Sequence, residues 1–434
     1  MQRQMWKLGV ILSLVVVVLS CTSNGILAQE MPENVKKMLE AAVDNKKAGN
    51  IAQYESVHRK IVSEYPGSDF ALASQIAIVQ NCFDQKDYIA AEKEMTLLKE
   101  SFSDTQGIAK GIHDLAQMYK NAGKREEALN WHRYNVAKYP DTFEGAVSQL
   151  EIVYDGFDRK DYDFVNKEAG FLLDNFSSRT GMSYGVYMVG KKYQDAGFVD
   201  KAEKIYRQCV SDAQGLGAML AQKEIIFNRL SKKSFNEAVS ELDLFKDIFA
   251  DTEGVSKQLF EIAQRYQRDG RLADAVILHR YNVDKYSDTF DGKVSQLEIV
   301  YDAFNRKDYD SVDKEANYLL DNFSKSSGMS YGMYMIGKRY QEAGFNDRGL
   351  MVYRKCVEDA KGLGAMLSLV GIIDDCFANN DVASATSYGA DLCSRFKDES
   401  GISGQLFQLA QKHVSVGDHD TAIKYYKFNM EKYP

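Results

Sequence analysis

The chain has 434 residues, only four of them proline, and a formal net charge of −8 at pH 7. The acidic charge and the absence of a basic stripe argue against a nucleic-acid partner, because phosphate binding relies on clustered Lys and Arg. Hydrophobic residues make up 45% and charged residues 27%, which excludes a disordered chain. Proline interrupts helices, so its scarcity predicts an almost all-helical protein.

The N-terminal segment 1–28 predicts export and is set apart from the fold. Arg3 and Lys7 precede the apolar run 8–20, which is too short to span a bilayer but suits a signal peptide. The run ends in Val-Leu-Ser-Cys at Cys21, which resembles a bacterial lipobox. This resemblance implies a periplasmic protein that lipidated Cys21 anchors to the outer membrane. The alternative is cleavage after Ala28, which would leave a soluble exported protein.

The chain repeats itself over two distances. Residues 132–220 match residues 279–367 at an offset of 147, with roughly seven in ten positions identical, which indicates a tandem duplication. A shorter period of 37 or 36 residues is marked by an aromatic residue that closes most units. Such a period is typical of helix-turn-helix repeats, which bury their apolar faces only by stacking. The sequence therefore predicts an all-α solenoid of about eleven helical pairs over residues 33–434.

Two kinds of unit alternate, and they differ in the turn between their helices. Glycine-turn units carry a glycine suited to the left-handed conformation that ends a helix. Capped-turn units instead carry Asp or Ser, whose side-chain oxygen can accept from the free amides of the next helix. The turn glycines are Gly49, Gly123, Gly197, Gly270, Gly344 and Gly417. The predicted caps are Asp87, Asp161, Ser234, Asp308 and Asp381.

The packing positions alternate as well. Seven residues before each turn glycine lies a small residue, whereas the equivalent position of the capped-turn units is β-branched. We expect small and large residues at stacked positions to let successive helices interdigitate. The small residues are Ala42, Ala116, Gly190, Ala263, Gly337 and Ala410. The β-branched residues are Val79, Val153, Ile226, Val300 and Ile373.

One glycine-turn unit reads Ile112-x2-Leu115-Ala116-x2-Tyr119-x3-Gly123-x4-Ala128, then reaches Pro140. This pattern resembles the tetratricopeptide repeat signature, with Ile112 replacing the usual aromatic residue. The resemblance covers residues 33–434, is strong in glycine-turn units and is weak in those between them. It implies a right-handed superhelical α-solenoid that binds proteins or peptides. The Tyr139-Pro140-Asp-Thr junction is also similar to those of bacterial envelope lipoproteins of the β-barrel assembly and Tol-Pal coordinator type.

In tetratricopeptide proteins the first helix of each pair lines the binding groove. Carried over by position, this implies a groove formed by four first helices of this chain. Tyr184, Tyr187 and Lys191 are spaced by three and four residues and therefore lie on one helical face. Tyrosine suits an interface, because it offers a rigid ring with a polar tip. Aromatic packing between neighbouring units is the alternative for these residues. The implied groove residues are Lys110, His113, Gln117, Tyr184, Tyr187, Lys191, Gln194, Lys257, Phe260, Gln264, Tyr331, Tyr334, Lys338 and Gln341.

No catalytic, cofactor-binding or metal-binding motif is found in the sequence. His58, His132 and His279 recur at one repeat position, but whole units separate them, so we predict buried structural histidines rather than metal ligands. Gly215-Leu-Gly217 and its duplicate lack the strand of a phosphate-binding loop, so we interpret them as the flexible start of a helix. The five cysteines after Cys21 give no disulfide pattern and are predicted to be small buried hydrophobes.

The sequence thus favours a non-enzymatic interaction scaffold in the bacterial cell envelope. A carbohydrate or cell-wall binding module is a second hypothesis, because aromatic side chains can stack on sugar rings. A third is the repeat region of a larger enzyme whose catalytic domain lies beyond residue 434. The last unit ends at Pro434 without the polar capping helix that a terminal repeat normally needs, which leaves a continuation open.

Overall fold

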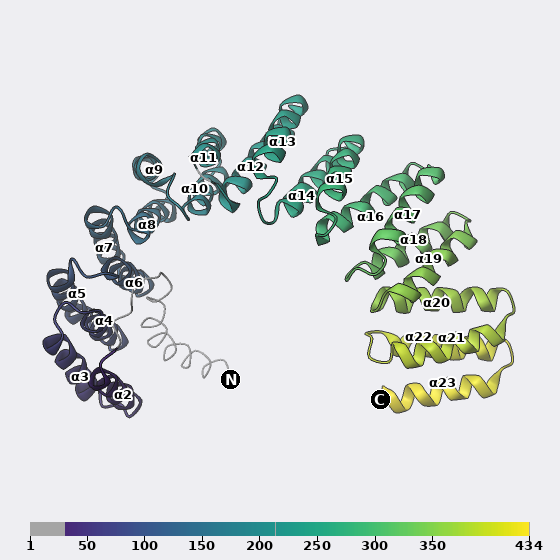
Figure 1. Cartoon of the computed structure of the whole chain (residues 1–434), viewed down its shortest axis with the longest axis horizontal. Coiled ribbons are helices and arrows are strands. Elements are labelled where there is room, and N and C mark those ends of the chain that lie inside the picture. The colour runs from purple at the N-terminus through teal and green to yellow at the C-terminus, as the bar shows by residue number, and fades with distance from the viewer. Residues whose placement is uncertain (1–30, 213, 434) are drawn as a thin grey trace. The chain divides into compact units, whose positions relative to one another are not determined.

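The computed structural model describes residues 31–212 and 214–433, and this part of the chain contains 22 helices and no strand (Figure 1). The helices form eleven pairs, as the sequence predicts. The first helices are α2 (Glu33–Lys47), α4 (Asp69–Asp84), α6 (Ile108–Asn121), α8 (Phe143–Arg159), α10 (Ser183–Asp195), α12 (Leu216–Ser231), α14 (Val255–Arg268), α16 (Phe290–Asn305), α18 (Ser330–Glu342), α20 (Leu363–Ala378) and α22 (Ile402–Ser415). The second helices are α3 (Ile51–Glu64), α5 (Tyr88–Phe102), α7 (Arg125–Lys138), α9 (Tyr162–Phe176), α11 (Val199–Asp212), α13 (Phe235–Phe249), α15 (Leu272–Tyr286), α17 (Tyr309–Phe323), α19 (Asn346–Asp359), α21 (Val382–Arg395) and α23 (His419–Lys432).

The pairs stack as in a solenoid. The chain divides into two compact units, one ending at Ala221 and the next beginning at Gln222. Inside each unit a first helix packs on its own second helix, and the second helix of a glycine-turn unit also packs on the following first helix, such as α7 on α8 and α19 on α20. Successive first helices also contact one another, such as α8 with α10 and α18 with α20. Each core is therefore continuous from pair to pair, which confirms the predicted all-α solenoid.

The N-terminal predictions concern residues that the structure does not describe. Segment 1–28, including Cys21, lies outside the described residues. Within the described part of the chain, no helix has the length and apolar character needed to cross a membrane.

The turns confirm most of the helix-ending predictions. All six turn glycines have a positive φ, between 75° and 86°. Asp87, Asp161, Asp308 and Asp381 each accept a hydrogen bond from the amide three residues on, but Ser234 makes no such bond, so the cap prediction is wrong there. The sequence did not reveal that the capped-turn units also use the left-handed conformation. The residue before each cap, a lysine or asparagine, adopts this conformation, which costs about 1–2 kcal/mol for a residue with a side chain. These residues are Lys86, Lys160, Lys233, Lys307 and Asn380.

The alternation of small and β-branched residues is confirmed, since every one of those positions is buried. The structure adds a reason why two of the small residues are glycine. A Cβ at Gly190 would overlap the ring of Tyr206, and a Cβ at Gly337 would overlap the ring of Tyr353. The pair of α14 and α15 has Ala263 and the smaller ring of His279 at the equivalent positions, and both residues are buried. Ring size on the second helix and residue size on the first are therefore matched in these three pairs, whereas the last pair has Ala410 and the half-buried Tyr426 at the equivalent positions.

Glycine also lets adjacent first helices approach each other. In three steps a branched side chain of a capped-turn unit enters a notch left by a glycine on the next first helix, where a Cβ would overlap it. The pairs are Ile76 with Gly111, Leu150 with Gly185 and Leu297 with Gly332. Gly217 has a related role, because its Cβ would overlap the backbone of Ser183 on α10. The Gly215-Leu-Gly217 segment does begin a helix, α12, as predicted, and close backbone packing is an additional reason for Gly217.

A buried polar clamp joins the two helices of four capped-turn units. A glutamine on the first helix donates from Nε2 to both the backbone oxygen and a carboxylate oxygen of a glutamate on the second. Arg280 also donates to the 4%-exposed Glu315, at 2.8 Å. Burial alone would raise the pKa of Glu315, but the hydrogen bonds from Arg280 and Gln296 outweigh it and hold the pKa below its usual value. The clamps are Gln75–Glu94, Gln149–Glu168, Gln222–Glu241 and Gln296–Glu315.

The recurring histidines lie in the core, as predicted. His58, His132 and His279 are each at most 2% exposed. Burial lowers the pKa of each of them to about 4. They are therefore neutral packing groups at neutral pH. The cysteines agree with their prediction too, because Cys82, Cys209, Cys356 and Cys376 are buried, although Cys393 is only half-buried.

We predict that the size match between the two helices can be transferred from one duplicate to the other. His279→Tyr alone should destabilise the protein by about 1–3 kcal/mol, because the larger ring meets the Cβ of Ala263. The double variant A263G/H279Y reproduces the Gly337 and Tyr353 pair, so it should recover most of that loss. In the pair of α18 and α19, Gln341 accepts a hydrogen bond from the Tyr353 hydroxyl. Gln267 occupies the equivalent position, so it can accept from the hydroxyl of the introduced tyrosine in the same way. Thermal and urea unfolding measure both effects, and additive losses in the double variant would contradict the match.

We also predict that stability falls in mildly acidic solution. The unfolded chain holds histidine protons from about pH 6.5 downward, whereas the three buried histidines resist protonation until about pH 4. Their contribution is therefore complete above pH 6.5 and is lost as the pH falls toward 4. Each histidine contributes up to about 1.4 kcal/mol per pH unit in this window. Urea unfolding from neutral pH to about pH 5 measures the slope, and A263G/H279Y should make it shallower. An unchanged urea midpoint would contradict this account.

Candidate binding surface

The implied groove residues all lie on first helices of glycine-turn units, namely α6, α10, α14 and α18. Their exposure divides them into three groups. Tyr187 is buried. The half-buried residues are His113, Gln117, Lys191, Gln194, Phe260, Gln264, Tyr334 and Gln341. The exposed residues are Lys110, Tyr184, Lys257, Tyr331 and Lys338.

The central aromatic residue of each helix packs inside its own helical pair. The ring of Tyr187 stacks on that of Tyr206 with centroids 6.0 Å apart, and Tyr334 stacks on Tyr353 at 5.8 Å. The rings of His113 and Phe260 contact those of His132 and His279 in a tilted arrangement, with centroids 5.4 and 5.5 Å apart. These four residues are therefore packing residues. Each packs on a ring of its own helical pair, and not on a ring of a neighbouring unit as the alternative supposed.

Tyr184 and Tyr331 differ from these, because they are 51% and 52% exposed. Tyr184 lies 5.9 Å from Tyr187, and Tyr331 lies 6.0 Å from Tyr334, measured between ring centroids. Each exposed ring thus rests on a packed one, which restricts its motion. A half-exposed tyrosine on a rigid base can contact a partner at a low cost in side-chain entropy.

The preceding first helix contributes a third tyrosine to each group. Burial raises the pKa of Tyr154 on α8 to about 12, with further contributions from Glu151 and Tyr184. The Lys192 ammonium lies 5.2 Å from the centroid of the Tyr154 ring. The duplicate matches this, because the Arg339 guanidinium lies 4.5 Å from the centroid of Tyr301 on α16. Such cation–π contacts are worth about 0.5–1 kcal/mol at exposed sites.

We name these two groups the tyrosine clusters. Each contains three tyrosines and two cationic side chains on two adjacent first helices, and each lies entirely within one compact unit. The first cluster consists of Tyr154, Tyr184, Tyr187, Lys191 and Lys192. The second consists of Tyr301, Tyr331, Tyr334, Lys338 and Arg339.

The sequence analysis did not identify Tyr154, Tyr301, Lys192 or Arg339 as site residues. Both tyrosines lie in capped-turn units, where the tetratricopeptide resemblance is weak. The groove positions implied by the resemblance therefore did not include them. A usable signal existed, because the tyrosine recurs at the offset of 147 that relates the duplicated blocks, and so does a cationic residue, as Lys192 in one block and Arg339 in the other.

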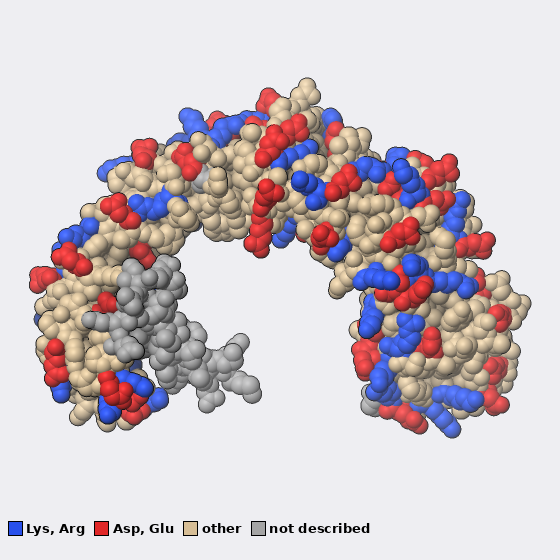
Figure 2. All heavy atoms as spheres, in the orientation of Figure 1, with Lys and Arg blue, Asp and Glu red and all other residues tan. Residues whose placement is uncertain are grey.

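The charges around the clusters are mixed. Lys191 pairs with Asp195 at 2.6 Å, and Lys338 approaches Glu342 at 3.8 Å. Figure 2 shows Lys and Arg interspersed with Asp and Glu over the visible face, without a large field of one sign. Aromatic contact area is therefore the main feature of these clusters. Net charge is a minor one.

Comparisons with known proteins give only distant likenesses. No protein-family model matches the chain, and no curated protein matches it. Among solved structures, the apo form of RapI is similar over 75% of this chain and 97% of its own, at 15% identity and a TM-score of 0.35. The human IFIT1 dimer with PPP-AAAA is similar over 96% and 93%, at 14% identity and a TM-score of 0.29. The TPR domain of P58(IPK) is similar over 76% and 94%, at 14% identity and a TM-score of 0.24. These likenesses are too distant to support an argument, and the fold is described as tetratricopeptide-like because its helical pairs stack one after another.

Proposed function

We propose that this chain is a non-enzymatic scaffold that binds other proteins or peptides through the tyrosine clusters on its first helices. The half-exposed rings of Tyr184 and Tyr331 are the observation that carries the proposal. Tyrosine is enriched among residues that dominate binding energy, because it combines a large rigid face with a hydroxyl group. The neighbouring cations add donors for carboxylate or backbone oxygens of a partner.

The duplication supports a scaffold that presents its contact surface twice. Each compact unit contains one cluster, so each unit can bind on its own. A partner with two copies of the recognised segment would bind with avidity, which exceeds the affinity of either cluster. Repeat proteins are suited to this role, because successive units add contact surface without new chemistry.

We further propose that the scaffold works in the bacterial cell envelope. The signal-like segment 1–28 and the lipobox-like sequence ending at Cys21 support this location. Lipidation of Cys21 would anchor the protein to the outer membrane and leave the solenoid in the periplasm. The partners would then be other envelope proteins.

We expect the double variant Y184A/Y331A to lose its partner. Affinity capture from detergent-solubilised envelopes, followed by mass spectrometry, should recover proteins with the wild type and at least about tenfold less of them with the variant. Such a loss corresponds to about 1.4 kcal/mol. These two tyrosines are better targets than Tyr187 and Tyr334, because truncating the packed rings would also disturb the core.

The matched control is F171A/Y318A. These aromatic residues are related by the same offset of 147 and are 45% and 42% exposed, but they lie on the second helices α9 and α17. The control should capture partners as the wild type does. Equal capture by all three proteins would refute the role of the clusters. Binding of peptidoglycan fragments that depends on Tyr184 and Tyr331 would instead favour the carbohydrate hypothesis.

Lipidation gives a separate prediction about location. In a bacterial host, the wild-type protein should fractionate with the outer membrane, and its mature N-terminus should be a diacylated or triacylated Cys21. The variant C21S should lose the lipid and the membrane association. Mass spectrometry of the N-terminal peptide distinguishes this from cleavage after Ala28. An unmodified N-terminus at residue 29 in the wild type would contradict the anchor.

A further inference from the structure

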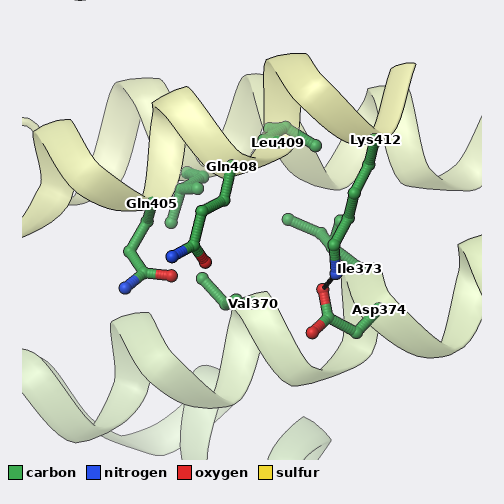
Figure 3. Close-up of a pocket in the computed structure, with 8 residues that line it drawn as sticks. Val370, Ile373, Asp374, Gln405, Gln408, Leu409 and Lys412 are labelled. Carbon is green, nitrogen blue, oxygen red and sulfur yellow. Dashed lines mark hydrogen bonds and ion pairs between the residues drawn. The ribbon is translucent and has the colours of Figure 1, made fainter. Parts of the chain in front are cut away.

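Polar side chains join successive first helices, and one of these contacts involves histidine. Figure 3 shows the step from α20 to α22, where Lys412 pairs with Asp374. In the step from α6 to α8, Lys120 pairs with Glu151 at 2.7 Å. The charges of lysine and carboxylate groups change little between neutral pH and about pH 5, so these pairs persist in mild acid. The step from α6 to α8 also contains His113, whose side chain can change its charge in that range.

His113 on α6 and His132 on α7 both contact one serine on α8. The Nδ1 atom of each ring lies 3.3 Å from Ser148 Oγ. Asn135 on α7 donates from Nδ2 to the same oxygen, at 2.9 Å. His113 is half-buried, and the other three residues are at most 2% exposed. Three helices therefore meet at one buried hydroxyl group.

The donors and acceptors at Ser148 determine where the two rings carry their hydrogens. A serine hydroxyl has one hydrogen to donate and two lone pairs that accept. Asn135 uses one lone pair, so Ser148 can accept from one ring and must donate to the other. The ring that accepts presents a bare Nδ1 atom, and this hydrogen bond favours its neutral form.

The buried ring identifies which histidine is the acceptor. His132 Nε2 is buried without a hydrogen-bond partner, so a hydrogen on that atom would be an unpaired buried donor. We therefore assign the hydrogen of His132 to Nδ1, which donates to Ser148. Ser148 then donates to the bare Nδ1 of His113, whose own hydrogen lies on Nε2.

A proton added to Nδ1 of His113 would break this arrangement. It would occupy the lone pair that accepts from Ser148, while both lone pairs of the hydroxyl oxygen are already used. The protonated ring therefore has no acceptor at this oxygen. Being half-buried, His113 is also the more accessible of the two rings.

The electrostatic surroundings set the pH range in which His113 takes up this proton. Burial lowers the pKa of His113 below its ordinary value of about 6.5, and nearby carboxylates offset part of the effect. The contribution of the contact is therefore complete above about pH 6.5 and is lost as the pH falls through the lowered pKa. Neutral His132 faces the ring from α7. The charged groups around it are Lys110 and Asp114 on α6 and Glu144 and Glu151 on α8.

The second block contains the equivalent serine without a second histidine. Phe260 occupies the position of His113. Asn282 donates to Ser295 Oγ at 2.9 Å, as its equivalent does in the first block. The Ser295 hydroxyl donates to Asp291 O on its own helix, also at 2.9 Å. The step from α14 to α16 therefore does not depend on a hydrogen bond to histidine.

We propose that His113 is an acid-released latch between α6 and α8, present in one of the two duplicated blocks. At neutral pH its ring accepts from Ser148 and holds the two first helices together. In mild acid the protonated ring leaves the hydroxyl, and the contact between the helices opens. Because α8 carries Tyr154, acid would weaken partner binding at the first tyrosine cluster more than at the second. Only this last consequence rests on the proposed function.

Hydrogen–deuterium exchange of the full chain at neutral pH and at about pH 5.5, corrected for the intrinsic rate at each pH, tests the latch. At the lower pH, exchange in α6 and α8 of the wild type should be roughly three- to tenfold faster. H113F should remove most of this increase. It should fold normally, because Phe260 and His279 pack with centroids 5.5 Å apart, close to the 5.4 Å of His113 and His132. Equal acid responses of the wild type and H113F would overturn the proposal.

The reverse variant F260H tests the same idea in the second block. The equivalent serine, histidine and asparagine are already present there, so F260H should give α14 and α16 the acid response that they lack in the wild type. A folded F260H protein without a gain in this response would contradict the hydrogen-bond argument.

Nitrogen-15 NMR of the histidine rings at neutral pH tests the placement of the hydrogens. The full chain should show the hydrogen of His113 on Nε2 and that of His132 on Nδ1, and H113F assigns the resonances. Hydrogens on the same nitrogen in both rings would contradict the network. These measurements involve no partner, so their outcome is separable from that of envelope capture.

Discussion

The close approach of successive first helices is the constraint on which this structure depends. A single helical pair cannot bury its own apolar face, so each pair needs a neighbour at short range. The notches at Gly111, Gly185 and Gly332 allow that range, because a branched side chain from the preceding first helix occupies the space of the missing Cβ. The same approach brings Tyr154 of α8 near Tyr184 of α10. The packing of the solenoid and the formation of the candidate surface therefore have one cause.

The duplication shows which parts of this packing are coupled. Where the second helix carries tyrosine, as at Tyr206 and Tyr353, the facing residue is glycine, and where it carries His279 the facing residue is Ala263. The last pair departs from this match, because it has Ala410 and the half-buried Tyr426 at the equivalent positions. Where residue size on the first helix matches ring size on the second, the match indicates that these residues contribute to stability.

Most of the architecture could be predicted from the sequence. The period of 37 or 36 residues, the turn glycines and four of the five caps are local signals, and each depends on residues close together in the chain. The left-handed lysines such as Lys160 escaped prediction because lysine carries no signal for that conformation. The clamp from Gln149 to Glu168 and the notch at Gly185 escaped because they join residues 19 and 35 positions apart. Such pairs become visible only when the helices are placed side by side.

The candidate surface was predicted in part. The resemblance pointed to the first helices, and Tyr184 and Tyr331 are exposed there as a contact surface requires. The resemblance did not separate these from Tyr187 and Tyr334, because spacing places all four on one helical face and does not reveal which ring the second helix covers. Tyr154 and Tyr301 belong to units that the family signature hardly describes. Their role depends on contact between helices of different units.

Hydrogen–deuterium exchange of the protein, alone and in complex with a captured envelope partner, tests the central claim most directly. If the tyrosine clusters form the binding surface, the partner should slow exchange in α8 and α10 and in their duplicates α16 and α18. Exchange in the second helices α9, α11, α17 and α19 should change little. Protection confined to those second helices, with the first helices unaffected, would contradict the account.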